Sequence, residues 1–213
     1  MNTVHNKMIA MDKTNSPSQR RYEKNRQSIL EAARAIVSEQ GIGALSMRAL
    51  ADRVDYSASA LYKYFKDKEE ILDALSTEAW RFSMEYGERH PPATSDPLDI
   101  LRQSGRNIYE FAKQYPAQYQ LMMTASKSSP KSLDEFMEYP SFKGLRMLLA
   151  EAVQAGKLRL PEGFTPDLLA FHMWFVIHGA SMARLTITRN FGPEIDELVD
   201  RLGGALNTLL KPD

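Results

Sequence analysis

Residues 45–72 constrain the fold of this chain more than any other segment. Met47, Leu50, Ala51 and Val54 fall at i, i+3, i+4 and i+7, the spacing that places apolar side chains on one face of a helix. A short amphipathic helix is therefore expected to begin near residue 47 and to bury that face.

A second short helix is expected directly after the first, over residues 58–65. Ser46 and Ser57 occupy the N-cap positions of the two helices, because their hydroxyls can accept hydrogen bonds from free amides. Leu61 and Phe65 lie one turn apart and point inward. Two such helices joined by a tight turn form a helix-turn-helix, whose second helix fits the major groove of duplex DNA.

The outer face of this second helix carries the candidate DNA contacts. Ser59 and Lys63 point most directly away from Leu61, and Ala60 and Tyr62 flank them. The small residues at the helix start would let the backbone approach base edges closely. Taken singly, Tyr62 is equally compatible with a half-buried core aromatic and Lys63 with a solvated charge, so the prediction depends on the whole constellation.

A third helix is expected to start just after residue 66. Asp67 and Glu70 form a capping-box pattern, and Lys68 lies in the first turn. Free backbone amides at a helix N-terminus can hold a phosphate, and Lys68 adds positive charge there.

These residues carry a resemblance to the DNA-binding domain of the TetR family of bacterial transcriptional regulators. The matching elements are a helix over residues 25–40 ending at Gly41, the Leu45-Ser46 start, and the run Ser57-x-x-x-Leu61-Tyr62-x-x-Phe65-x-x-Lys68-Glu69. The resemblance implies that Ser46, Ser59, Tyr62 and Lys68 contact the DNA backbone or groove, and that Lys63 is a candidate base reader. With Ser57, Ala60 and Tyr64, these residues make up the predicted DNA-binding set.

Two positions depart from the family pattern. Asp55 stands where the turn normally carries Gly, and Tyr64 stands where His is common. Asp tolerates the left-handed conformation moderately well, so the turn is expected to form with slight strain. Tyr64 is expected to alter a phosphate or base contact.

The rest of the chain is predicted to be helical, giving an all-α protein with a small helix-turn-helix domain before a larger helical domain. No period-two run of β-branched residues is present, so no sheet is expected. Further helices are expected over residues 68–86, 98–113, 117–126, 141–155, 166–188 and 193–210. The predicted domains are a flexible basic arm over residues 1–20, a helix-turn-helix domain over 21–68, and an effector-binding and dimerisation domain over 69–213.

Charge is balanced over the 213 residues but not along them. The formal net charge is zero, whereas residues 1–30 carry six basic and two acidic side chains, a local net charge of +4. Such an arm can neutralise phosphates and make DNA binding depend on salt. A solubilising disordered tail before Pro17 is an equally good interpretation.

The second half carries a weaker resemblance, to a C-terminal regulatory domain of some TetR-family members. It rests on Phe111-Ala112-x-x-Tyr115-Pro116, on Ala155-Gly156-Lys157-Leu158 and on Trp174-x-x-x-His178-Gly179. In such proteins the last two helices pair with those of a second subunit. Leu198, Leu202, Leu206 and Leu209 are therefore the predicted homodimer interface, although the same face could pack onto its own domain.

An apolar effector cavity is expected in this half, because methionines adapt to irregular ligands. The candidate lining residues are Tyr109, Met122, Met123, Phe136, Met137, Met173, Trp174 and His178. Taken individually, most of them fit plain core better, and a cavity is expected only from the set as a whole. His178 alone fits a hydrogen-bonded structural histidine better than a ligand. His172 and His178 lie about 120° apart around a helix, so they do not form a metal pair.

Several classes of protein are excluded by what the sequence lacks. There is no cysteine, and no catalytic, dinucleotide or Walker motif appears, so neither an enzyme, a metal site nor a cofactor is expected. No apolar run of about eighteen residues is found, so no membrane span is expected. The prediction is a cytoplasmic, nucleoid-associated bacterial repressor that binds double-stranded DNA as a homodimer and responds to a small apolar or amphipathic effector. The alternative is a helical small-molecule-binding or protein-interaction module without specific DNA recognition.

Overall fold

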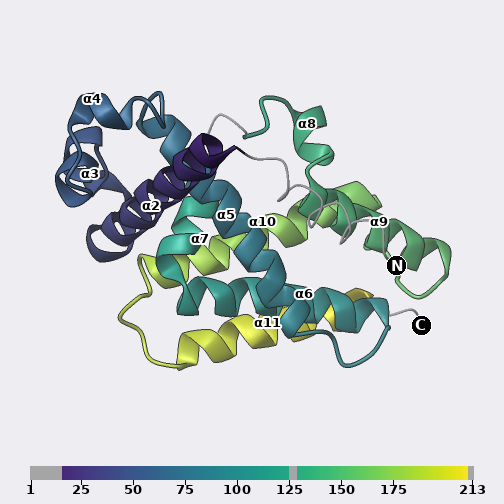
Figure 1. The fold of residues 1–213 in the computed structure, drawn as a ribbon. Helices are drawn as coiled ribbons and strands as arrows, with labels where there is room; N and C mark the ends of the chain where they lie inside the picture. The colour runs from purple at the N-terminus through teal and green to yellow at the C-terminus, as the bar shows by residue number, and fades with distance from the viewer. Residues whose placement is uncertain (1–15, 125–128, 211–213) are drawn as a thin grey trace. The chain divides into compact units, whose positions relative to one another are not determined.

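A computed structural model describes residues 16–124 and 129–210, and within these residues the chain is helical, with no strand (Figure 1). The all-helical prediction is confirmed. The elements are α2 (Pro17–Gln40), the 3-10 turn η2 (Ile42–Ala44), α3 (Met47–Arg53), α4 (Ala58–Leu61), α5 (Lys68–Arg89), α6 (Pro97–Gln114), α7 (Pro116–Met123), α8 (Leu133–Met137), α9 (Pro140–Gln154), α10 (Pro166–Leu185) and α11 (Glu194–Leu210).

The chain forms two compact units that divide after Ser76, within α5. The predicted domain boundary at 68/69 stays a prediction. Of the predicted basic arm over residues 1–20, residues 1–15 lie outside the described residues, and α2 already begins at Pro17.

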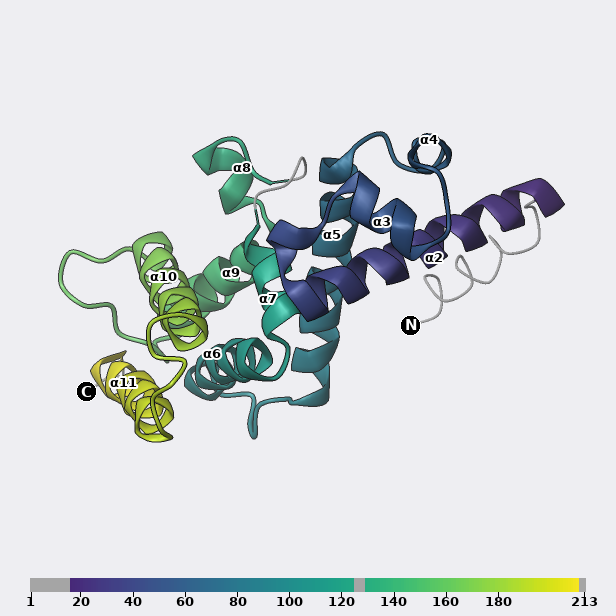
Figure 2. The same cartoon turned by 90° about the vertical axis from the view of Figure 1, so that its left-hand side faces the viewer.

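In the N-terminal unit, α3 packs against α2, and α4 packs against α3 (Figure 2). Ser16 caps α2 by accepting a hydrogen bond from the Gln19 amide, and Pro17 occupies the first helical position. The helix ends at Gly41, whose φ of 84° suits a residue without a Cβ atom. The buried apolar residues of this unit are Ile29, Leu30, Ala33, Ile36, Val37, Leu45, Leu50, Ala51, Leu61, Phe65, Ile71 and Leu75.

In the C-terminal unit, α6 lies beside α10 and α11, and α9 packs against α10 (Figure 1). A buried cluster holds these helices together through Leu101, Phe142, Leu149, Leu169 and Leu210. Burial of apolar side chains on this scale is the main force that stabilises such a unit.

Some helix limits differ from those expected from the sequence. Helix α2 begins eight residues before residue 25, because Ser16 and Pro17 form a good start that lies before the apolar stripe. Helix α10 ends at Leu185 instead of 188. Helix α8 was not predicted, since five residues are too short for a periodic pattern. Its N-cap is Ser132, whose hydroxyl accepts a hydrogen bond from the Glu135 amide, while the Glu135 carboxylate accepts one from the Lys131 amide.

By length and composition alone, α10 is the one described helix apolar enough to cross a membrane, whereas no apolar run of that length was found in the sequence and no membrane span was expected. Core helices of other proteins pass the same test. Helix α10 packs on α6 and α9, and it carries Asp167, His178 and Arg184.

Candidate functional site

Helix α4 presents its outer face to solvent from a fixed base. The Ser57 hydroxyl accepts a hydrogen bond from the Ala60 amide at 3.2 Å, as its N-cap position predicts. Leu61 and Phe65 are fully buried beneath the helix. The α-helix proper ends at Leu61, four residues before the expected limit, but the Phe65 amide still donates to the Leu61 carbonyl at 3.0 Å. The turn after α4 therefore continues the helical path as far as Phe65.

The predicted reading residues lie on the open side of α4. Ser59 and Lys63 are exposed, and Tyr62 is 56 % exposed, a large value for an aromatic side chain. Ala60 is half-buried. The Ser59 hydroxyl is hydrogen-bonded to that of Ser57 at 2.9 Å. These side chains are accessible to a large partner such as a nucleic acid.

Tyr64 is placed differently from the other predicted contacts. It is half-buried, stacks on Tyr22 with ring centroids 5.0 Å apart, and lies 6.3 Å from Tyr56. Its hydroxyl accepts a hydrogen bond from the Asn25 side-chain amide at 2.9 Å. The Tyr22 hydroxyl donates to the Lys63 carbonyl at 3.3 Å. Tyr64 thus helps to join the turn that follows α4 to α2.

The turn between α3 and α4 contains the left-handed residue that the sequence predicted at Asp55. Asp55 has a φ of 55°, and among the described residues it is the one non-glycine residue with a positive φ. The Tyr56 amide donates to the Ala51 carbonyl at 3.1 Å and closes the turn. The left-handed conformation at Asp55 is what redirects the chain from α3 into α4.

The two remaining predicted DNA contacts lie at helix starts. The exposed Ser46 caps α3 by accepting from the Ala49 amide at 3.1 Å. Lys68 is half-buried in the first turn of α5. Asp67 accepts from the Glu70 amide there at 2.8 Å, and Glu70 accepts from the Lys66 amide at 2.8 Å. The capping pattern read from the sequence forms, with Lys66 in place of Asp67 as the reciprocal donor.

The C-terminal unit contains a cavity of about 840 Å³. Tyr109, Met122, Met173, Trp174 and His178 line it, as the sequence predicted. Met123, Phe136 and Met137 are absent from its described wall; Phe136 and Met137 pack instead against the buried cluster around Phe142. Both tryptophans of the chain, Trp80 and Trp174, are in the wall.

His178 lines the cavity and also forms a buried hydrogen bond. Its Nδ1 atom lies 2.7 Å from the Tyr119 hydroxyl, and its ring lies 4.3 Å from that of Trp174. Burial lowers the pKa of His178 to about 4 and raises the pKa of Tyr119 to about 12. Both side chains are therefore neutral near pH 7, which agrees with the interpretation of His178 as a hydrogen-bonded structural histidine.

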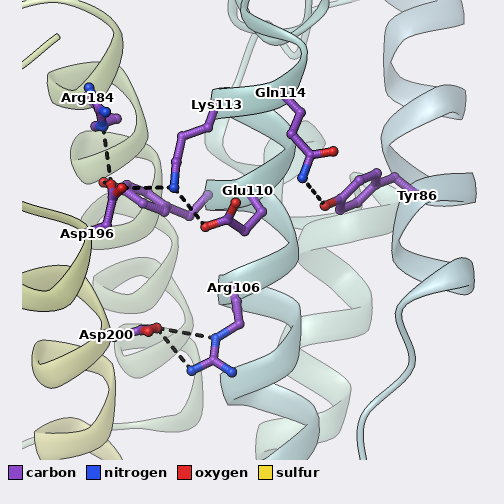
Figure 3. Close-up of polar contacts among 9 residues, drawn as sticks. Tyr86, Arg106, Glu110, Lys113, Gln114, Arg184, Asp196 and Asp200 are labelled. Carbon is purple, nitrogen blue, oxygen red and sulfur yellow. Dashed lines mark hydrogen bonds and ion pairs between the residues drawn. The ribbon is translucent and has the colours of Figure 1, made fainter. Parts of the chain in front are cut away.

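A polar network ties α6 to α10 and α11 at the edge of the cavity (Figure 3). Asp196 accepts hydrogen bonds from the Tyr109 hydroxyl at 2.7 Å and from Arg184 Nε at 3.2 Å, and it pairs with Lys113 at 2.9 Å. Burial alone would raise the pKa of Asp196, but the hydrogen bonds from Lys113 and Tyr109 and the charges of Lys113 and Arg184 outweigh it and lower that pKa. One turn further along α11, Asp200 pairs with Arg106. The sequence reading missed this network, because it joins residues that are far apart in the chain.

Apolar side chains remain exposed on both C-terminal helices. Leu198 and Leu202 on α11 are 49 % and 56 % exposed. The side chains of Leu206 and Leu209 lie outside the described residues. On α10, an exposed stripe at helical spacing consists of Leu168, His172, Phe175, Val176 and Gly179. Large exposed apolar areas of this kind are typical of protein–protein contacts.

Comparisons with known proteins give a consistent answer. Residues 29–75 match the family model of bacterial regulatory proteins, tetR family. The HTH-type transcriptional repressor KstR of Mycobacterium tuberculosis is 40 % identical over 95 residues, which cover 44 % of this chain and 41 % of the relative. The chain spans about half the length, or less, of the curated relatives that it matches.

Solved structures extend the likeness beyond the first domain. A protein of unknown function from Rhodococcus sp. RHA1 has a TM-score of 0.70 at 22 % identity, covering 87 % of this chain and 95 % of the other. AibR, in complex with isovaleryl coenzyme A and operator DNA, has a TM-score of 0.60 at 17 % identity, covering 84 % and 96 %. At these identities the likeness concerns the fold.

Proposed function

We propose that this chain, whose residues 29–75 match the family model of bacterial regulatory proteins, tetR family, binds a pseudo-palindromic operator as a homodimer and represses transcription until a small molecule occupies its C-terminal cavity. The observation that carries the proposal is the outer face of α4, where Ser59, Tyr62 and Lys63 are exposed above the buried Leu61 and Phe65. A rigid base under accessible polar side chains is what reading of a groove requires. Such a regulator acts in the cytoplasm, where the operator is.

Two copies of α4 would enter successive major grooves about 34–36 Å apart. Lys63 would read base edges, and Ser46 and Lys68 would contact phosphates. Phosphate contacts fix the position of the protein on DNA, whereas contacts with base edges carry the sequence preference.

The exposed apolar stripe on α10 and the exposed leucines of α11 support a homodimer. A second copy would cover both faces. Phe175→Glu or Leu198→Glu should shift the sedimentation of the full chain toward the monomer, and neither residue lines the cavity. Met147→Glu is the matched control, because Met147 is exposed on α9, a helix that carries neither face. Equal sedimentation of all three variants would contradict this interface.

The cavity supports a small apolar or amphipathic effector, and AibR, a neighbour in fold, holds isovaleryl coenzyme A. An effector weakens operator binding only through its difference in affinity for the two conformations. That coupling is typically about 1–3 kcal/mol, or roughly 5- to 150-fold. An operator affinity that no cavity ligand changes would contradict the switch.

The DNA proposal is tested by selecting sites from random duplexes and titrating salt against the selected site. A steep fall in affinity with salt is expected of a DNA-binding protein, and no fall is expected of a module without DNA recognition. Lys63→Ala should relax the preference at particular base pairs by about 1–3 kcal/mol, whereas Lys68→Ala should weaken all duplexes alike. Lys157→Ala, at an exposed position in the C-terminal unit, is the control. If Lys63→Ala leaves the preference intact, its assignment as base reader is wrong.

A further inference from the structure

Charged side chains from α6 and α11 line part of an otherwise mostly apolar cavity. Trp80, Leu145, Leu148 and Trp174 supply apolar wall. The charged lining residues are Arg102, Arg106 and Glu110 of α6 and Asp196 and Asp200 of α11, and Glu110 is paired with Lys113. An apolar ligand alone would leave these charges without a role in recognition. Recognition of a ligand by one of these groups requires that the group can exchange its present partner for the ligand.

The Arg106–Asp200 pair is the exchangeable one. Nε and an Nη of Arg106 both donate to the same Asp200 oxygen, at 3.3 and 3.1 Å, so the guanidinium does not engage both carboxylate oxygens. Arginine binds carboxylates and phosphates most strongly when two parallel hydrogen bonds form. The two side chains are also 48 % and 61 % exposed, and such pairs stabilise a fold weakly.

Asp196, one turn before Asp200 on α11, contrasts with it. Three donors hold Asp196: Tyr109, and Lys113 and Arg184, which Figure 3 labels. A ligand would have to replace all three to release it. Asp200 has one partner side chain in this network and is already largely hydrated, so its release to water carries little cost.

We propose that Arg106 is the anion-recognition residue of the cavity, and that the carboxylate or phosphate of an amphipathic ligand takes the place of Asp200. The apolar body of the ligand would lie against Trp80 and Trp174. Arg102 lines the same cavity one turn earlier on α6, where it pairs with Asp99, and it adds positive charge beside the head group. This inference rests on the proposed function in one respect, that the cavity is the effector site.

An anion fits better than a cation for two reasons. The short Asp200 side chain on α11 cannot follow a ligand inward, whereas the long Arg106 side chain can turn its remaining donors toward one. After exchange, the free Asp200 would lie one turn from Asp196. The charge of Asp196 is already stabilised by its own donors, which are Tyr109, Lys113 and Arg184. Ligand binding would then remove one tie between α6 and α11, next to the exposed Leu198 and Leu202.

The test uses three probes with the same ten-carbon chain and different heads: decanoate, decan-1-ol and decylammonium. Binding is followed by tryptophan emission of the full chain, because both tryptophans line the cavity. Decanoate should bind most tightly. Arg106→Gln should weaken decanoate by about tenfold or more, since a charged hydrogen bond is lost, and should leave decan-1-ol within about twofold. Asp200→Asn should tighten decanoate by several-fold, because Arg106 loses its internal competitor.

Arg201→Gln is the matched control, since Arg201 is exposed on α11 and does not line the cavity. Unchanged binding of decan-1-ol to Arg106→Gln shows that the cavity is intact. The inference would be overturned if the native chain preferred decylammonium or responded to no probe. It would also be overturned if Arg106→Gln lost affinity equally for all three probes or kept its affinity for decanoate. Because no DNA is present, a failure of operator binding would leave the result standing.

Discussion

Acid is expected to destabilise the C-terminal unit through His178. Burial lowers the pKa of this imidazole from 6.5 to about 4, because the charged form is poorly solvated in the fold. In the unfolded chain the imidazole takes up a proton below about pH 6.5, so the unfolded state binds more protons than the folded state between these values. As far as it depends on His178, the free energy of unfolding is therefore at its full value above about pH 6.5 and falls as the pH is lowered toward 4.

The size of the effect follows from the two pKa values. Each pH unit between them costs up to about 1.36 kcal/mol, which gives a loss of about 2 kcal/mol at pH 5 and roughly 3 kcal/mol near pH 4. The lowered pKa of Asp196 acts in a different range. Its stabilising effect is present above the ordinary value of 3.8 and is lost only as the pH falls below that value.

The assay is urea unfolding followed by tryptophan emission at pH 7.5 and pH 5. Both tryptophans lie in the C-terminal unit, and the Trp174 ring is 4.3 Å from that of His178. The native chain should lose about 2 kcal/mol of unfolding free energy between these pH values, and His178→Gln should lose much less. Because each protein is compared with itself at the two pH values, a lower overall stability of the variant does not affect the comparison. Equal losses in the two proteins would refute the assignment.

The remaining predictions concern the N-terminal unit. Leu61→Ala removes a fully buried side chain and should lower the free energy of thermal unfolding by about 2–5 kcal/mol. Tyr62→Ala should change that free energy by no more than about 0.5 kcal/mol, but it should weaken binding to the selected duplex. The reverse pattern would mean that the faces of α4 are misassigned. Asp55→Val should destabilise by about 1–2 kcal/mol, because a β-branched residue tolerates positive φ poorly, while Asp55→Asn should be nearly neutral; equal calorimetric effects of the two changes would contradict the strain argument.

The local parts of the fold could be predicted from the sequence because their determinants are neighbours in the chain. Ser46 and Ser57 each cap an amide three residues ahead, and Leu61 and Phe65 anchor a single turn. Short-range hydrogen bonds of this kind follow from residue type and spacing alone.

The parts that could not be predicted depend on distant residues. Tyr64 finds its partners Tyr22 and Asn25 about forty positions away. Arg106 meets Asp200 across an even longer stretch of chain. Residue type also does not decide which side of a helix faces a cavity, so Phe136 and Met137 were predicted to line the cavity although they pack against the core.

Photo-crosslinking from α4 to DNA tests the central claim most directly. The chain contains no cysteine, so Ser59→Cys introduces a single thiol on the outer face of α4 for a photoactivatable label. Ser38→Cys, at an exposed position on α2, is the control. The account predicts crosslinks from position 59 to bases of the selected duplex in two half-sites, about 34–36 Å apart. The absence of base crosslinks from position 59, or equal yields from position 38, would contradict it.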